Sequence, residues 1–356
     1  MAENGSADNI RTDNKGTSPA HGASGTRGAA RGRTGDCVVA IAGASPDAPP
    51  PGLSAGLPGC DIRFIPARER LASDAADAEI VFAWEPWTGG LRESWGFTPN
   101  LRWIAAATVG VDWLLFPELA GSDVIVTNSA GVFDAAMAEY TLALVSAICA
   151  DLHTTIRLQT RREWQHRETT RLAGRRAIVL GAGGIGRAIN RALDRAGVIP
   201  KCVGRHSRVD PELGRIAALD ELPGLLPEAD FVILALPLTV HTKGLFGASE
   251  FSLMRPGSWL INLGRGALVD DQELIRALRN GAIGGAALDV FTQEPLPPDS
   301  PLWDLPNAII SRHMSGDFRG WDRALAGLFL AQLRRYRSGE PLINVVDKSL
   351  GYVPGS

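Results

Sequence analysis

Three residues in the second half of the chain have types that could together hold a carboxylate and move a proton. Arg265 stands in I-N-L-G-R-G, Glu294 in L-D-V-F-T-Q-E-P and His313 in I-I-S-R-H-M-S-G. An arginine can bind a carboxylate and polarise a neighbouring carbonyl, and a histidine can protonate a developing alkoxide. A carboxylate bonded to the histidine fixes its tautomer and raises its pKa towards neutral or above. This combination suits reversible hydride transfer to a 2-keto acid.

Each of the three residues also has an ordinary structural interpretation. Taken singly, Arg265 could be a surface residue at a helix start, Glu294 a solvated loop residue and His313 a satisfied core histidine. However, each follows an apolar stretch typical of a strand, and strand ends line the ligand crevice of an open α/β sheet. Three such residues at successive strand ends favour a catalytic site.

A glycine turn in the middle of the chain predicts a dinucleotide-binding site. Residues 177–186 read A-I-V-L-G-A-G-G-I-G and run into a helical pattern. In this G-x-G-x-x-G motif the first glycine allows a tight turn, the second leaves room for a pyrophosphate, and the third lets helix and strand pack closely. The helix N-terminus then offers N–H groups to the phosphates. The predicted contacts are Gly181, Gly183, Gly184, Ile185 and Gly186.

The residues after the next strand bear on which cofactor is bound. An acidic residue about 20 positions after the last glycine would bind the ribose of NAD. Here Arg205 lies 19 residues after Gly186, with Ser207 and Arg208 beside it. Guanidinium groups match a phosphate, so we predict that NADP(H) is favoured over NAD(H). The alternative is that the arginines are solvated and Asp210 reaches back to bind NAD.

Length and composition exclude several other classes of protein. With 356 residues there is room for about two domains. A hydrophobic content of 45% and a net charge of −3 fit a globular protein without a strong field for nucleic acid or membranes. The four cysteines are scattered without C-x-x-C spacing, which indicates buried thiols and no disulfide framework or metal site. No apolar run approaches 18 residues, so we expect a cytoplasmic protein with no membrane partner. Because the net charge is small, we also expect no nucleic-acid partner.

The pattern along the chain predicts two domains behind an N-terminal tail. Residues 1–35 are rich in small and polar types, which predicts disorder, and their arginines are nearly balanced by acids. Beyond them, short apolar runs alternate with helical stretches, as in parallel sheets covered by helices. Because the dinucleotide unit begins mid-chain, we predict a substrate-binding domain from 36–134 and 319–356, with a dinucleotide-binding domain at 135–318 between them.

Three helices have clear signals. Residues 135–152 are apolar nearly all round, which predicts a buried helix in the core or against a second subunit. Asp270 with Glu273 marks the start of another helix that ends near Gly281. A last amphipathic helix is expected over residues 320–338.

The ordered set of motifs resembles the D-isomer-specific 2-hydroxyacid dehydrogenases, over about residues 37–352. The matching stretches are A-T-V-G-V-D, N-S-A-G-V-F-D-A-A-M-A-E-Y, G-A-G-G-I-G, L-P-L-T-V-H-T, M-R-P-G-S-W-L-I-N-L-G-R-G-A-L-V-D, A-A-L-D-V-F-T-Q-E-P-L and H-M-S-G. The resemblance implies that Arg265, Glu294 and His313 are catalytic. It also implies that the backbone amides of Val109 and Gly110 bind the substrate carboxylate.

The same resemblance implies a fold, further contacts and an assembly. The fold would be α/β, with a Rossmann dinucleotide-binding domain inserted into a flavodoxin-like substrate-binding domain. Pro237 and Thr242 would lie near the cofactor, and Asp289 would face the nicotinamide carboxamide. The partner would be a small 2-keto or 2-hydroxy acid, and the helix from Ala135 would form part of a homodimer interface.

Several residues depart from the family pattern or narrow it. Arg312 stands where most relatives have proline, and an inward guanidinium would lower the pKa of His313. Gly264 replaces a more usual alanine. The G-R-H-S-R segment resembles NADP(H)-using glyoxylate/hydroxypyruvate reductases, whereas formate dehydrogenases pair their histidine with glutamine in place of Glu294. Trp84 fits either the wall of the substrate pocket or the core.

Three points stay open in the sequence. The substrate could be glyoxylate, hydroxypyruvate or a bulkier keto acid, and the physiological direction of the reaction is not indicated. A dinucleotide-sensing protein like the corepressors that share this fold is the alternative from another functional class, because a fold alone does not define a function.

Overall fold

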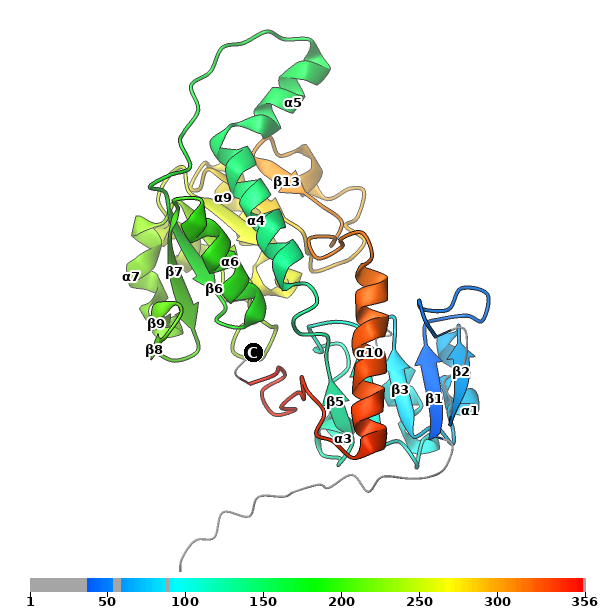
Figure 1. Cartoon of the computed structure of the whole chain (residues 1–356). Helices are drawn as coiled ribbons and strands as arrows, with labels where there is room; N and C mark the ends of the chain where they lie inside the picture. Colours follow the sequence, from blue (N-terminus) through cyan, green and yellow to red (C-terminus); the bar gives the residue numbers. More distant parts are fainter. Residues whose placement is uncertain (1–36, 54–58, 87–89, 355–356) are drawn as a thin grey trace, which may run out of the picture.

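The computed structural model describes residues 37–53, 59–86 and 90–354 of the chain. Within them the chain forms two α/β bodies, each built on its own sheet (Figure 1). The tail predicted over residues 1–35 lies outside the described residues.

The first sheet is parallel and has the order β2-β1-β3-β4-β5, which is the flavodoxin-like order. The central strands β1, β3 and β4 are almost entirely buried and apolar, as expected for a sheet with both faces covered, whereas the edge strand β2 is largely half-buried. Their bounds are β1 Cys37–Ala42, β2 Cys60–Ile65, β3 Ile80–Ala83, β4 Trp103–Ala106 and β5 Ile125–Thr127. Short helices cover one face, at α1 Leu71–Asp74, α2 Gly90–Glu93 and α3 Pro117–Ala120.

The second sheet has the order β13-β12-β11-β10-β6-β7-β9-β8. All neighbouring strands are parallel except the pair β8 and β9, so β6 and β10 flank the point where the strand order reverses. That point is where open α/β sheets bind their ligands. The strands are β6 Arg176–Leu180, β7 Ile199–Gly204, β8 Arg208–Asp210, β9 Gly214–Ala218, β10 Phe231–Leu234, β11 Trp259–Asn262, β12 Gly285–Leu288 and β13 Ala308–Ile310.

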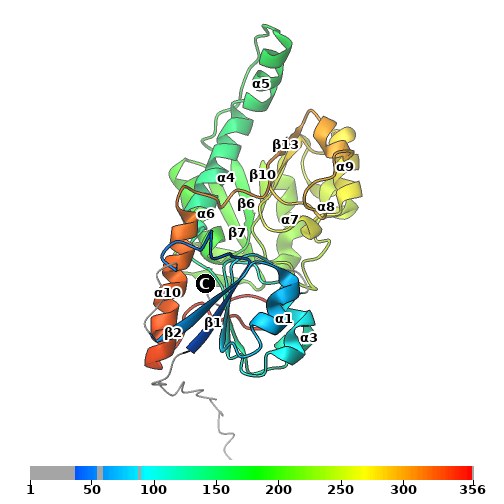
Figure 2. The same cartoon turned by 90° about the vertical axis from the view of Figure 1, so that its right-hand side faces the viewer.

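Helices cover both faces of this second sheet (Figure 2). One face packs against α4 Asp134–Cys149 and α6 Gly184–Arg195, and the other against α7 Leu222–Leu225, α8 Ala248–Leu253 and α9 Asp271–Arg279. Asp270 caps α9 as predicted, because its carboxylate accepts from the backbone N–H groups of Gln272 and Glu273. Turns of 3₁₀ helix lie at Arg68–Arg70, Trp95–Phe97, Leu219–Glu221, Leu226–Glu228, Gly266–Leu268 and Pro301–Asp304.

The helix predicted over residues 135–152 is broken, which corrects the sequence analysis. The chain forms α4 and then α5 Leu152–Arg161, and the two helices are bent by 63°. The break falls at Asp151, whose φ of 51° is left-handed and cannot continue a right-handed helix. Only one face of α4 is buried in this chain, and its opposite face, with Ala135 and Ala143, is exposed.

No single helix among the described residues is long and apolar enough to cross a membrane, although α4 and α5 taken together have the necessary length and composition.

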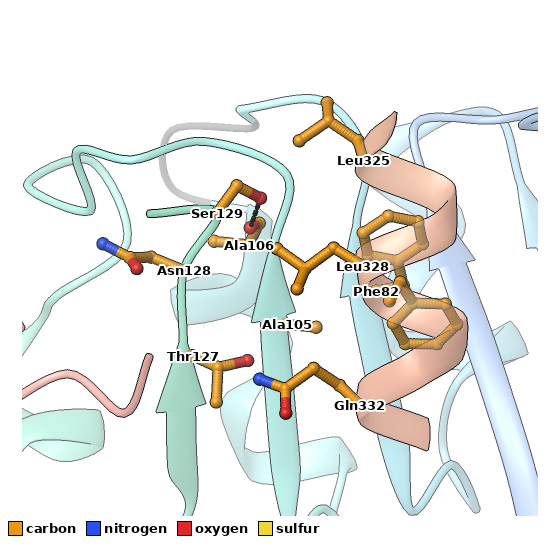
Figure 3. Close-up of a pocket in the computed structure, with 10 residues that line it drawn as sticks. Phe82, Ala105, Ala106, Thr127, Asn128, Ser129, Leu325, Leu328 and Gln332 are labelled. Carbon is orange, nitrogen blue, oxygen red and sulfur yellow. Dashed lines mark hydrogen bonds between the residues drawn. The ribbon is translucent and has the colours of Figure 1, made fainter. Parts of the chain in front are cut away.

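The last helix, α10 Trp321–Ser338, returns to the first sheet and covers its second face (Figure 2). Phe329 stacks on Phe82 of β3 with ring centroids 4.2 Å apart. A small cavity of about 10 Å³ remains between this helix and β3, β4 and β5, enough for about one water molecule (Figure 3). Gln332 of the helix bonds to both backbone groups of Ile343 and so fixes the returning C-terminal segment. The domain boundaries predicted above stay a proposal.

Candidate active site

The three candidate catalytic residues follow three neighbouring strands of the second sheet. Arg265 comes after β11, Glu294 after β12 and His313 after β13, and these strands pair side by side. Since parallel strands end at the same edge of a sheet, the chain brings all three residues to one edge.

The loop of Arg265 is shaped by the residues around it. Asn262 accepts from the backbone N–H of Gly264 at 3.1 Å and donates to the carbonyl of Arg265 at 2.9 Å, closing a local turn. A side chain at Gly266 would collide with the backbone of Phe291. Glycine at this position therefore lets the loop of Arg265 lie against the loop that carries Glu294.

His313 and Glu294 form a hydrogen-bonded pair. Nδ1 of His313 lies 2.8 Å from Oε2 of Glu294, whose Oε1 accepts from the backbone N–H of Phe291 at 2.9 Å. The hydrogen bond to Glu294 raises the pKa of His313 above its ordinary value, with burial and the charge of Arg265 opposing the rise. Burial would raise the pKa of Glu294, but its hydrogen bonds to His313 and Phe291 lower it overall. The pair thus favours the imidazolium form of His313, and no hydrogen bond from the residues that the structure describes occupies its Nε2.

The backbone of His313 is held in an unusual conformation by Asp289. His313 has a φ of 55°, in the left-handed region that non-glycine residues rarely adopt. Asp289 is 1% exposed and accepts from the backbone N–H groups of Met314 and Ser315 at 2.9 and 2.8 Å, and from the hydroxyl of Ser311 at 2.6 Å. In this structure Asp289 therefore fixes the loop that presents the histidine.

The loop after β4 presents two backbone amides. The carbonyl of Thr108 accepts from the backbone N–H of Ser129 at 3.0 Å, and the carbonyl of Val109 accepts from the side chain of Asn128 at 2.7 Å. Because the N–H and C=O of a trans peptide point in opposite directions, the N–H groups of Val109 and Gly110 point away from residues 128 and 129. They are free to face a ligand. Figure 3 shows Asn128 and Ser129 at the end of β5, beside this loop.

Arg265 joins that loop across the two sheets. Its Nε lies 3.0 Å from Oδ1 of Asp112, and its Nη1 donates to the carbonyl of Gly264 at 2.8 Å. A side chain at Gly110 would collide with Nη2 of Arg265, so this nitrogen lies directly over the glycine. One guanidinium nitrogen therefore lies beside the loop that carries the two backbone amides, and donors of this kind suit a carboxylate.

The glycine turn has the geometry that the motif predicts. Gly181 has a φ of 128°, and a side chain there would collide with the carbonyl of Ala235 after β10. A side chain at Gly186 would collide with the carbonyl of Gly181. Helix α6 begins after Gly183 without a side-chain cap, and Gly184 and Ile185 form its first turn. These residues fit a dinucleotide, because the helix starts without a side-chain cap and glycines at 181, 183 and 184 leave room beside its first N–H groups.

The candidate residues for cofactor choice differ in their surroundings. Arg205, Ser207 and Arg208 are exposed, and Nη1 of Arg208 lies over Gly204, beside the glycine turn. Asp210 is buried. Its carboxylate accepts from both terminal nitrogens of Arg187 at 2.9 and 2.5 Å.

Further hydrogen bonds to Asp210 come from the backbone N–H groups of Glu212 and Leu213. The bond from Arg187 contributes most, and together these contacts hold the pKa of Asp210 far below its usual range. The carboxylate that the alternative prediction assigned to ribose binding is thus engaged inside the protein.

The remaining predicted residues fall around these sites. The hydroxyl of Thr242 donates to the carbonyl of Pro237 at 2.7 Å, which closes the turn after β10. Trp84 stacks on Trp321 of α10 with centroids 6.0 Å apart, and both are half-buried. Arg312 is exposed, and the charged groups that shift the pKa of His313 are Glu294, Arg265 and Asp289.

Sequence reasoning missed three residues that position the site. Asp112 ends the T-V-G-V-D motif, Asn128 starts N-S-A-G and Asn262 lies three residues before Arg265. All three lie in the motifs that carry the family resemblance, and the available signal was a polar residue at or just after a strand end for Asn128 and Asn262, whereas Asp112 lies farther along the loop after β4. Among the described residues, no group of three or more His, Cys, Asp or Glu side chains could hold a metal ion.

Comparisons with known proteins agree with this geometry. Residues 142–315 match the family model for the NAD-binding domain of D-isomer specific 2-hydroxyacid dehydrogenases. A glyoxylate reductase of Aeropyrum pernix is 33% identical over 71% of this chain and 78% of its own length.

Solved structures give the same result. A D-isomer specific 2-hydroxyacid dehydrogenase of Xanthobacter autotrophicus, in complex with NADPH and MES, has a TM-score of 0.77 and 31% identity over 89% of this chain and all of its own. An NADPH-dependent glyoxylate/hydroxypyruvate reductase of Sinorhizobium meliloti has a TM-score of 0.77 and 26% identity over the same shares.

The fold and the matches define a two-domain, NAD(P)-dependent oxidoreductase. The chain belongs to the D-isomer-specific 2-hydroxyacid dehydrogenase family, which acts on small 2-keto and 2-hydroxy acids. These comparisons support the enzyme and give no support to the dinucleotide-sensing alternative.

Proposed function

We propose that this protein is an NADPH-preferring reductase of small 2-keto acids, in the glyoxylate and hydroxypyruvate class, that forms D-2-hydroxy acids. The observation that carries the proposal is the 2.8 Å contact between His313 and Glu294 at the sheet edge that also holds Arg265. The relatives named as glyoxylate and glyoxylate/hydroxypyruvate reductases support the substrate class.

Three hydrogen-bond donors beside the loop after β4 are assigned to binding of the substrate. Nη2 of Arg265 and the backbone N–H groups of Val109 and Gly110 hold the carboxylate of the keto acid. Asp112 occupies Nε of Arg265 and so turns the outer nitrogen towards the substrate loop. Binding a carboxylate through several fixed donors orients the neighbouring carbonyl.

Proton transfer is assigned to the dyad. When bound, the reduced nicotinamide supplies the hydride that reaches C2 of the keto acid. His313 gives its Nε2 proton to the carbonyl oxygen. Glu294 accepts the Nδ1 hydrogen bond, which fixes the tautomer and favours the charged imidazole.

Preference for NADPH is assigned to the exposed cations after β7. Arg205, Ser207 and Arg208 offer charged and hydroxyl donors for a 2′-phosphate, and Asp210 is held by Arg187. A carboxylate at that position would repel a phosphate if it were free. The solved relatives in complex with NADPH and with NADP agree with this assignment.

We also propose that the enzyme is a cytoplasmic homodimer. Helix α5 and the segment after it project away from both sheets (Figure 1). They carry large apolar side chains in solvent, with Leu152 47%, Ile156 60% and Trp164 101% exposed. Such a surface is typical of a subunit contact, and the free cysteines fit a reducing compartment. Light scattering should give twice the chain mass, and Trp164→Glu with Ile156→Glu should give the single mass.

The activity is tested by initial rates of NADPH and NADH oxidation with glyoxylate, hydroxypyruvate, pyruvate, 2-ketoisocaproate and phenylpyruvate. We expect turnover with glyoxylate or hydroxypyruvate, a higher kcat/KM with NADPH, and the D enantiomer on chiral chromatography. Binding of NADPH without turnover of any of these acids would contradict the proposal.

A further inference from the structure

Two cysteines meet at the edge of the first sheet that lies opposite the active site. Cys37 begins β1 and Cys60 begins β2, and the two residues are direct partners in the parallel register. Their sulfur atoms lie 2.9 Å apart although 23 residues separate them in the chain. The sequence predicted four scattered, buried thiols. It did not predict this pair, because the pair arises from strand register and not from spacing in the chain.

The backbone geometry permits a bond between the two sulfurs. Paired residues on neighbouring strands lie about 4.8 Å apart, within the Cα separation of about 4.4–6.8 Å that a disulfide spans. Both residues belong to the same rigid sheet, so little chain entropy is lost when the sulfurs join. The thiols already face one another.

The surroundings give the two thiols different roles. Cys37 is 7% exposed, and Cys60 is half-buried. Burial, and then the hydrogen bond with Cys60, raise the pKa of Cys37 to about 12, so Cys37 keeps its proton. A side chain at Gly59 would collide with Nη2 of Arg337, which places that guanidinium beside the pair. Cys60, which is more exposed than Cys37, is therefore the sulfur assigned to first contact with an oxidant.

We propose that Cys37 and Cys60 form a reversible disulfide when the protein meets a hydroperoxide. The Cys60 thiolate attacks the peroxide, breaks the O–O bond and becomes a sulfenic acid, with release of water or an alcohol. The Cys37 sulfur then attacks the Cys60 sulfur, the S–S bond forms, and the hydroxyl leaves as water with the proton from Cys37. Two thiols are oxidised to one disulfide, and one peroxide is reduced.

The other two cysteines serve as internal controls. Cys149 and Cys202 have no thiol partner, and burial raises the pKa of each, that of Cys202 to about 11. They should therefore stay reduced. Because strands of the first sheet run from the cysteine pair towards the substrate loop, the pair lies a strand length from the proposed site. The proposal does not rest on the proposed function.

The experiment compares the full chain with Cys60→Ser and with a Cys149→Ser/Cys202→Ser double variant. Each protein is treated with a small excess of hydrogen peroxide, denatured, alkylated and weighed by mass spectrometry. Wild type and the double variant should lose two alkylation sites and two hydrogen atoms, and dithiothreitol should restore both. Their Tm should rise by about 5–10 °C on oxidation, as for a loop of this size. Cys60→Ser should show none of these changes.

Three results would overturn the proposal. Wild type could keep all its alkylation sites, or could lose them through a bond between two chains on a non-reducing gel. The double variant could also lose its oxidation product, which would place the chemistry at Cys149 or Cys202. Unchanged kcat/KM after oxidation would show that the cysteine pair and the catalytic edge are independent, as expected here.

Discussion

The proposed substrate side and the proposed adenosine side of this enzyme use an arginine–aspartate pair in opposite ways. Asp112 holds Arg265 through one nitrogen, and both side chains stay about one quarter exposed. Asp210 binds both terminal nitrogens of Arg187, accepts two backbone N–H groups as well, and is 7% exposed. Asp112 leaves the outer nitrogen of Arg265 available to a ligand. The carboxylate of Asp210, by contrast, is occupied by Arg187 and two backbone N–H groups and is not available to a ligand.

This contrast implies that changes on the two sides should have different kinetic consequences. Residues around Arg265 touch the proposed reacting atoms and should affect turnover. Residues around Asp210 lie beside the glycine turn and should affect the choice between NADPH and NADH.

Removing the proposed general acid should have the largest effect. His313→Ala should lower kcat by on the order of 10²–10⁴, because protonation of the alkoxide is lost. The Kd for NADPH, measured by fluorescence titration, should stay unchanged. Unaltered turnover would remove His313 from the mechanism.

Changing the partner of the histidine should shift the pH profile. As the proposed general acid of the reduction, His313 must be protonated, and its pKa lies above the ordinary 6.5. The rate should thus be flat at low pH and fall as pH rises through that raised value. Glu294→Gln should lower turnover at neutral pH by roughly 10–100-fold and move the fall to lower pH. A profile that keeps its midpoint in this variant would show that another group titrates.

Asp112→Asn tests the pair on the substrate side. Loss of the charge-assisted contact should let Arg265 move and reduce kcat/KM for the keto acid about tenfold, mostly through KM. The matched control is Asp210→Asn, which breaks the other pair and should leave the KM for the keto acid unchanged. Equal losses in both variants would contradict the separation of the two sides.

Reversing a charge on the adenosine side should have the smallest effect on the chemistry. Arg205→Asp should shift the ratio of kcat/KM values from NADPH towards NADH by about tenfold, with kcat for the preferred cofactor largely retained. An unaltered ratio would show that Arg208 or another group decides the preference.

Local sequence predicted some features well and others poorly. The glycine turn, the cap at Asp270 and the strand ends before Arg265, Glu294 and His313 were predicted because their signals lie within a few residues. The contact of Cys37 with Cys60 depends on strand register and leaves no mark in spacing.

Three other features were also beyond local pattern. The break at Asp151 depends on one left-handed residue that periodicity does not reveal. The ion pair of Asp112 with Arg265 joins residues 153 positions apart. The ion pair of Asp210 with Arg187 depends on how β8 folds back. Such long-range contacts decide which charged groups are available to a ligand.

The return of α10 to the first sheet has a consequence for how the protein is made. The second sheet is continuous in the chain and can fold soon after β13 is synthesised. The first sheet is complete by residue 127, yet its face with Phe82 and Trp103 stays uncovered until Trp321–Ser338 has left the ribosome. Each nascent chain therefore carries an apolar surface through the synthesis of almost 200 residues, at about 5–20 residues per second. Translation rate and chaperone supply should thus limit the yield of folded enzyme.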